Sequence, residues 1–248
     1  MKYRRGRKKS VPDSRTLRFA DYVKPKALAA PPKAVNWYSE VSSWPMYAND
    51  TLGCCTISAL GHAQNAWTKY ATGVEAGPTR DQVINAYNKL SPKDDGVDML
   101  TSLKYFAKTG IGGKKIAAYC QLDNGSLEQA KLAIELFGGV YFGLELPDAI
   151  VNAPDMLTIP WDVASCGRVG DPNEGHAVWI SGYETTDYFF FDPITWAKRI
   201  TMSGSAYQDW GDEVYAIVSP QWIAKNGLSP SGFDLAQLLS DRAAVAAA

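Results

Sequence analysis

Residues 53–73 read GCCTISALGHAQNAWTKYATG, and this stretch predicts one long helix with a cysteine in its first turn. Apolar side chains recur within it at spacings of three and four residues, and Gly73 supplies a stop. We therefore expect a helix from about Cys55 to Ala71. A helix N-terminus favours negative charge, so Cys55 stands where a thiol is most easily converted to a nucleophilic thiolate.

The rest of the first half is also predicted to be mainly helical. Two capping signatures, a Ser or Thr followed three residues later by Gln, stand ahead of apolar runs. An apolar stripe between them ends at a glycine. These features are Thr79 with Gln82, Ser126 with Gln129, and residues 100–107 with Gly110.

The second half changes character, because short aromatic and β-branched runs follow one another with turns between them. They indicate the strands of an antiparallel sheet, and a helical lobe followed by a β lobe is an α+β layout. The runs are GVYFGLEL (139–146), HAVWISGY (176–183), YFFFD (188–192), KRITM (198–202) and EVYAIVS (213–219).

Charge is unevenly distributed along the chain. Residues 1–33 hold eleven Lys or Arg against Asp13 and Asp21, so this arm carries +9 and the remaining 215 residues carry −10. A basic arm predicts an anionic partner, such as nucleic acid bound without specific sequence readout, an acidic protein surface or a neighbouring copy in an assembly. The alternative is a solvated, disordered tail.

A Pro-Pro pair in AAPPKAV, residues 29–35, marks the end of this arm, because proline disfavours helix in the residue before it. We accordingly divide the chain into a basic extended arm (1–31), one folded domain (32–225) and a C-terminal tail or helix (226–248).

Composition also excludes several classes of protein. No apolar run approaches the roughly 18 to 20 residues of a membrane span, and no apolar signal segment follows the basic start. Four cysteines, two of them adjacent, do not form a disulfide framework, so we expect a cytoplasmic protein or, alternatively, a virion component. Two histidines and no Cys-x-x-Cys spacing leave no metal site, and no cofactor is expected.

Only one histidine is suitably placed to act with Cys55. His62 lies seven residues along the same helix, roughly 10 Å away at 1.5 Å per residue, which is too far for proton transfer. His176 begins a predicted strand, and a hairpin would bring Asp192, at the end of the next strand, beside it. The spacing predicts a nucleophile, a base and a residue that orients the base. The alternative is that the cysteine and the histidine are ordinary core residues.

These segments follow one another as in the papain-like cysteine peptidases, which the chain resembles over about residues 32–218. The resemblance rests on Asn36–Trp37 after Pro32, on the segment DMLTSLKYFAKTGI (98–111), on GHAVWISGY (175–183), on Trp196 after Asp192, and on WGDEVYAIVS (210–219). It implies a two-lobed papain-like α+β fold, with an N-terminal helical lobe and a C-terminal antiparallel β lobe, and peptide or protein substrates. The Gly-x-Cys-Thr segment is similar to that of short bacterial and phage proteins without assigned activity.

The resemblance also implies roles for further residues. Asn49, with the backbone N–H of Cys55, would bind the oxyanion, and the substrate cleft would include Gly53, Gly175 and Trp196. The chain departs from the family pattern where Asn49 replaces a Gln and Asp192 replaces the commoner Asn. The expected activity is that of a cysteine hydrolase, a peptidase acting through a Cys-His-Asp triad. The alternative is a non-catalytic structural or interaction protein, such as a phage virion component, docked by its basic arm.

Overall fold

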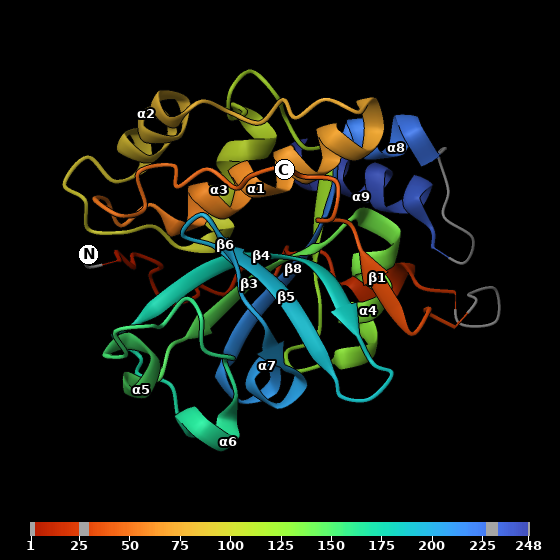
Figure 1. Ribbon diagram of the computed structural model, residues 1–248. Coiled ribbons are helices and arrows are strands. Elements are labelled where there is room, and N and C mark those ends of the chain that lie inside the picture. The colour runs from red at the N-terminus through yellow and green to blue at the C-terminus, as the bar shows by residue number, and fades with distance from the viewer. Residues whose placement is uncertain (1–2, 25–29, 227–232, 248) are drawn as a thin grey trace.

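The computed structural model describes residues 3–24, 30–226 and 233–247 (Figure 1). Helices lie on both sides of an antiparallel sheet. The helical elements are η1 (Phe19–Tyr22), α1 (Cys55–Thr72), α2 (Arg80–Leu90), α3 (Met99–Lys108), α4 (Leu127–Phe137), α5 (Asp148–Val151), α6 (Val163–Cys166), α7 (Gly204–Trp210), α8 (Pro220–Asn226) and α9 (Leu235–Ala247).

The sheet has the order β2-β8-β3-β4-β5-β6, with β1 added to β4 and β7 added to β5, and the paired strands are antiparallel. Strand β4 is central, because its first half pairs with β3 and its second half with β5 and β1. The strands are β1 (Ala34–Asn36), β2 (Ala118–Gln121), β3 (Val140–Glu145), β4 (Gly175–Glu184), β5 (Phe190–Thr195), β6 (Lys198–Arg199), β7 (Met202–Ser203) and β8 (Gly211–Val218).

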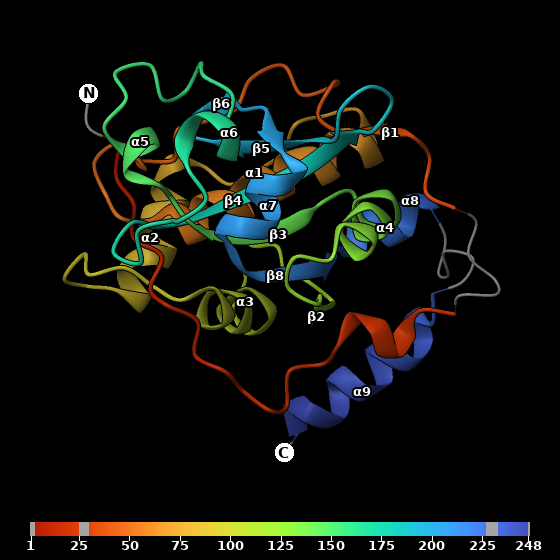
Figure 2. The same cartoon turned by 90° about the horizontal axis from the view of Figure 1, so that it is seen from below.

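Helix α1 lies inside the molecule, between the sheet and the outer helices α2 and α3 (Figures 1 and 2). Its first fourteen residues, from Cys55 to Thr68, are all buried. Trp67 of this helix packs edge-on against Trp179 of β4, with ring centroids 5.3 Å apart. Because the helix is buried on every side, its apolar residues are not confined to one face. The same packing fixes the start of α1 against the sheet.

Alternation along the strands divides the core into two parts. In β3, Tyr141 faces α1, whereas Val140 and Phe142 face the opposite side. In β4, Trp179 also faces α1. The sheet therefore separates an α1–α3 core from a core that contains α4, α7 and α9.

The predicted helices and strands are confirmed, and so is the α+β class. The helix expected over residues 55–71 is α1. The capping box of α2 is complete, since the Thr79 side chain accepts from the Gln82 N–H and the Gln82 side chain accepts from the Thr79 N–H. The runs that predicted strands correspond to β3, β4, β5, β6 with β7, and β8. Strands β1 and β2 and the short helices α5 to α8 have weak local patterns and were not predicted.

Candidate active site

Cys55 is the first residue of α1, and its side chain is buried. Its thiol lies beside the backbone of Ala177, the residue that follows His176 in β4, and beside the backbone of Gly6. Burial raises the pKa of the Cys55 thiol, whereas these backbone N–H groups and the charge of Arg7 act in the opposite direction. The buried Cys55 thiol is therefore protonated at neutral pH.

His176 is fully buried, and two neighbours hold its ring. Its Nε2 atom lies 2.7 Å from the Thr195 hydroxyl oxygen, and its ring stacks on Trp196 with centroids 4.0 Å apart and planes 14° apart. Burial lowers the pKa of His176 well below its usual range, and the positive charges of Arg5 and Arg7 add to this. The other ring nitrogen, Nδ1, makes no hydrogen bond within the described residues, so in the neutral ring it is available to a further partner.

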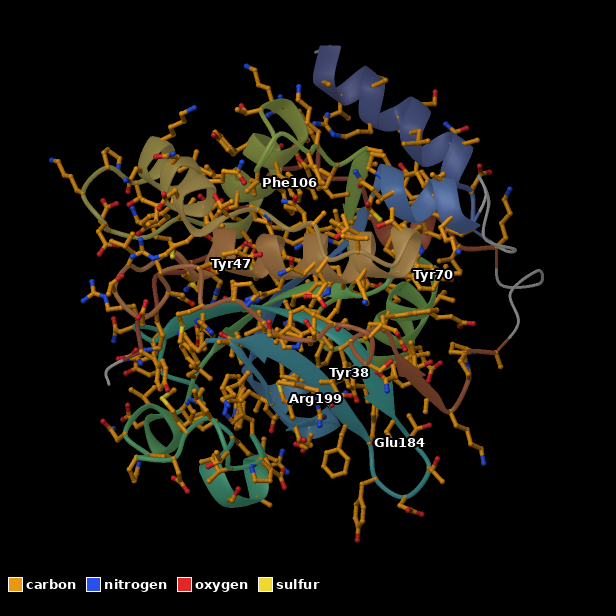
Figure 3. All side chains as sticks on the ribbon, turned by 45° about the horizontal axis from the view of Figure 1, so that its top comes forward. Tyr38, Tyr47, Tyr70, Phe106, Glu184 and Arg199 are labelled. Carbon is orange, nitrogen blue, oxygen red and sulfur yellow. The ribbon has the colours of Figure 1, made fainter. Side chains whose placement is uncertain are left out.

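Asp192 is not the partner of His176, which corrects the predicted triad. Its carboxylate instead accepts a hydrogen bond of 2.6 Å from Arg199, whose guanidinium lies over the ring of Tyr38, 4.9 Å from its centroid (Figure 3). The hairpin exists, but His176 lies eleven residues before its midpoint at Asp187 and Asp192 only five after it. Antiparallel partners stand equally far from the turn, so Asp192 lies opposite the irregularity between Ile180 and Tyr183 and not near His176, and the hydroxyl that contacts the His176 ring belongs to Thr195.

A strained turn presents Thr195 and Trp196 to the histidine. Strands β5 and β6 are joined by the two residues Trp196 and Ala197, with φ of 44° and 62°. Both values lie in the left-handed region, which two-residue hairpins require and which side chains other than glycine disfavour. The surrounding structure therefore holds the Trp196 ring against His176 at a conformational cost.

The N-terminal arm runs through this site. In Figures 1 and 2 it passes the start of α1 and continues below α3 towards α9. Its backbone is bound on both sides in extended form. The backbone bonds are Arg4 N–H to Asn49 O (3.1 Å), Val97 N–H to Gly6 O (2.9 Å), Lys8 N–H to Val97 O (3.1 Å) and Arg7 N–H to Gly175 O (3.2 Å).

Glycines form the walls of this channel, because the arm leaves no room for side chains. A β-carbon on Gly96 would stand 2.2 Å from the Gly6 carbonyl oxygen, and one on Gly175 would stand 2.4 Å from the Arg7 carbonyl oxygen. Gly53 contacts the arm from the side of α1. The channel over Cys55 is thus shaped for a bare, extended peptide backbone.

Asn49 directs its side-chain amide at a peptide carbonyl in this channel. Its Nδ2 group donates to the Arg4 carbonyl oxygen (3.1 Å) and to the Leu52 carbonyl oxygen (3.2 Å), and Trp196 Nε1 donates to the same Arg4 oxygen (3.1 Å). Two N–H donors that converge on one carbonyl oxygen form an arrangement suited to polarising that carbonyl. The predicted cleft residues Gly53, Gly175 and Trp196 all contact the arm.

Six basic side chains in the described part of the arm form ion pairs with carboxylates outside the arm. The anionic partner predicted from the charge of the arm is therefore, in large part, the folded body of the same chain, and ordering the arm requires no other anion. The pairs are Arg4–Asp94, Arg5–Glu174, Arg7–Asp212, Arg7–Glu213, Lys8–Asp95, Arg18–Asp123 and Lys24–Asp234.

His62 and Cys54, the remaining reactive side chains near the site, have structural roles. His62 Nε2 lies 2.8 Å from the Pro45 carbonyl oxygen, to which it donates, and its ring packs on Trp44 and Tyr47. The Cys54 thiol donates to the Tyr47 carbonyl oxygen, and burial raises its pKa to about 12. Cys55 is the cysteine of this pair that borders the channel.

Within residues 3–24, 30–226 and 233–247, no group of three or more His, Cys, Asp and Glu side chains is placed to hold a metal ion. Over the same ranges, no helix has the length and apolar character needed to cross a membrane.

Comparison with solved structures finds the same fold in several cysteine proteases. Xylellain, a cysteine protease from Xylella fastidiosa, matches with a TM-score of 0.67 and 16% identity over 88% of this chain and 97% of that chain. Digestive procathepsin L 3 from Tenebrio molitor larval midgut matches with a TM-score of 0.61 and 12% identity over 88% of this chain and 76% of that chain. Bromelain protease from Ananas comosus matches with a TM-score of 0.55 and 13% identity over 76% of this chain and 99% of that chain. No family model and no curated protein matches the sequence. The chain therefore has the papain-like fold.

Proposed function

We propose that this protein is a cysteine peptidase whose active site is covered by its own N-terminal arm. One observation carries the proposal: the channel over Cys55 holds an extended peptide backbone by main-chain hydrogen bonds on both sides. A site that binds the arm in this way can bind a peptide substrate in its place. The papain-like fold supports the same activity.

In the proposed reaction His176 removes the proton from Cys55, and the thiolate attacks a substrate carbonyl carbon. The carbon–sulfur bond forms, and the negative charge on the oxygen is stabilised by the Asn49 amide and the Cys55 backbone N–H. His176 then gives its proton to the leaving amine as the carbon–nitrogen bond breaks, and water hydrolyses the acyl-enzyme. Thr195 holds the ring in position throughout, in the role first assigned to Asp192.

The resting state is inactive for two reasons. The arm fills the channel, and burial beneath it keeps both reacting groups uncharged, since the pKa of Cys55 is raised and that of His176 is lowered. Displacing the arm admits water and substrate together, which favours the ionised pair. Activity therefore requires that the arm leave the channel.

Gly6→Ala in the full chain tests this proposal, because the added methyl group cannot fit beside Gly53. We expect this variant to cleave casein or a fluorogenic peptide mixture and to form an adduct with an epoxide thiol-protease inhibitor at Cys55 rather than at Cys54, as located by mass spectrometry. Adding Cys55→Ala should abolish both signals. Lys9→Ala, which changes an exposed side chain of the same arm, is the matched control and should remain inactive.

A second candidate function is a non-catalytic peptide-binding protein, such as an assembly component that keeps the papain-like fold. The observation that favours it is the Asn49 amide, which is already shared between the arm and Leu52. Peptide binding by Gly6→Ala without cleavage or Cys55 labelling would support this function over the first.

A further inference from the structure

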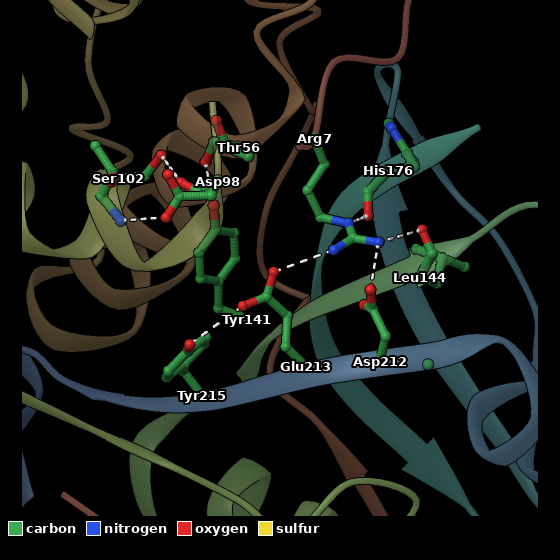
Figure 4. Close-up of polar contacts among 12 residues, drawn as sticks. Arg7, Thr56, Asp98, Ser102, Tyr141, Leu144, His176, Asp212, Glu213 and Tyr215 are labelled. Atoms are coloured by element: carbon green, nitrogen blue, oxygen red, sulfur yellow. Dashed lines mark hydrogen bonds and ion pairs between the residues drawn. The ribbon is translucent and has the colours of Figure 1, made fainter. Parts of the chain in front are cut away.

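The pocket that receives the side chain of Arg7 is built for a guanidinium group (Figure 4). Arg7 Nε donates to the His176 carbonyl oxygen (3.0 Å), and Nη1 donates to Glu213 (3.1 Å). Nη2 donates to Asp212 (2.8 Å) and to the Leu144 carbonyl oxygen (3.3 Å). Four acceptors from three strands thus match the planar fork of donors that only arginine carries.

The acceptors belong to strands of the folded body and are held by contacts outside the arm. Glu213 is fully buried, and its second carboxylate oxygen accepts a hydrogen bond of 3.2 Å from the Tyr215 hydroxyl. Gly143 leaves the space for the guanidinium, because a β-carbon there would stand 2.6 Å from Met99, 2.9 Å from Glu213 and 3.2 Å from Arg7. The pocket is therefore a feature of the folded body rather than of the arm.

The pocket favours a cation. Glu213 with Asp212 places two carboxylates together, one of them wholly removed from water, and an unpaired buried carboxylate is strongly unfavourable. When the arm leaves, a positively charged side chain has to replace Arg7, water has to enter, or Glu213 has to take up a proton, since burial raises its pKa. A peptide with arginine at this position restores every contact.

The pocket adjoins the reacting atoms. Arg7 follows Gly6, whose backbone lies against the Cys55 thiol, and Arg7 Nε bonds the carbonyl of His176 itself. We propose that this pocket is an arginine-selecting subsite, so that the substrates are basic peptides with an arginine within two residues of the cleaved bond. This inference rests on the proposed peptidase function and names the substrate class of the same site.

The test uses Gly6→Ala, in which the pocket is unchanged and the arm is displaced, with fluorogenic peptides that carry Arg, citrulline, Lys or Leu at successive positions. We expect kcat/KM to be higher for Arg than for citrulline or Leu by at least about ten-fold at one position, with Lys between them. Adding Glu213→Gln should reduce the preference for Arg by at least about ten-fold and leave Leu peptides nearly unaffected. Equal cleavage of Arg and Leu peptides would overturn the inference while leaving the peptidase intact.

A binding measurement separates the two proposals if no peptide is cleaved. Calorimetry with Gly6→Ala/Cys55→Ala would compare acetyl-Gly-Arg-Gly-amide with its citrulline analogue, which has the same shape but no charge. Binding of the Arg peptide at least about ten-fold tighter supports the subsite even though peptidase activity has failed. Equal binding of the two peptides would show that the pocket serves only to anchor the arm. Arg7→Ala, whose pocket is emptied directly, repeats both measurements should Gly6→Ala not fold.

Discussion

The Nε2 atom of His176 lies 2.7 Å from the hydroxyl oxygen of Thr195, while one face of its ring stacks on Trp196. A hydroxyl therefore occupies the place where an amide or carboxylate was expected. Because a hydroxyl can donate or accept, it can support the ring in either protonation state.

Replacing this hydroxyl should impair catalysis. In the Gly6→Ala background we expect Thr195→Val, which keeps the shape of the side chain, to lower kcat by about 10- to 100-fold, as the loss of a buried hydrogen bond worth about 1–3 kcal/mol implies. Asp192→Asn in the same background is the control and should change kcat by less than about three-fold. A large loss in Asp192→Asn with none in Thr195→Val would restore the original triad.

The contacts of the arm should differ widely in importance. Arg7 is a buried ion-pair partner whose removal costs about 3–5 kcal/mol, whereas Arg4 and Asp94 form a partly exposed pair worth about 0–1 kcal/mol. We expect iodoacetamide to modify Cys55 about a hundred-fold faster or more in Arg7→Ala, and less than about five-fold faster in Arg4→Ala. Rates from peptide mass spectrometry check this, and equal rates in the two variants would contradict it.

Acidification should destabilise the fold through its buried histidines. Burial lowers the pKa of His62 to about 4, whereas histidine in the unfolded chain has a pKa of about 6.5. The contribution of the neutral His62 to the free energy of unfolding is therefore fully present above about pH 6.5 and is lost as the pH falls towards 4. At pH 5 the loss from His62 amounts to about 2 kcal/mol, and His176 adds to it in the same direction.

Urea unfolding at pH 7 and pH 5 measures this loss. His62→Gln keeps a side-chain donor for the Pro45 carbonyl but does not titrate, so its stability should fall less over the same interval. If the variant and the parent lose equal amounts, His62 is not responsible.

The left-handed turn at Trp196–Ala197 should respond to glycine. Ala197→Gly relieves a disfavoured conformation, and we expect it to raise the free energy of unfolding by up to about 1 kcal/mol. Ala197→Val should lower it by more than about 1 kcal/mol, because β-branched residues tolerate positive φ poorly. Denaturant midpoints for the two variants give the comparison, and changes of the same sign in both would refute the argument.

Much of the fold could be predicted because its signals are local. The spacing of apolar residues identified α1, and the capping sequence, Thr79 with Gln82, identified the start of α2. The position of Cys55 at a helix N-terminus followed from the same pattern. The edge strand β2 is only four residues long, and its pairing with β8 comes from distant sequence that no local pattern reports.

The error over Asp192 has a specific physical origin. The sequence located both strands of the hairpin, but pairing depends on where the turn is centred and on the irregularity between Ile180 and Tyr183. Counting residues equally from a turn centred at Asp187 places position 198 opposite His176, which argues against Asp192 but does not by itself select Thr195. The docking of the arm was not predictable either. The available signal was Gly6, a single glycine within the basic segment RRGRKK, because a glycine allows a close approach of another backbone.

The arm and the channel it fills belong to one polypeptide, and this has a consequence for regulation. An intramolecular ligand has an effective concentration fixed by its connection, of millimolar order even for short flexible linkers. Dilution therefore leaves occupancy unchanged, and a competing peptide has to reach comparable concentrations or bind more tightly. Proteolytic removal of the first ten residues or a binder that captures them would act at any protein level.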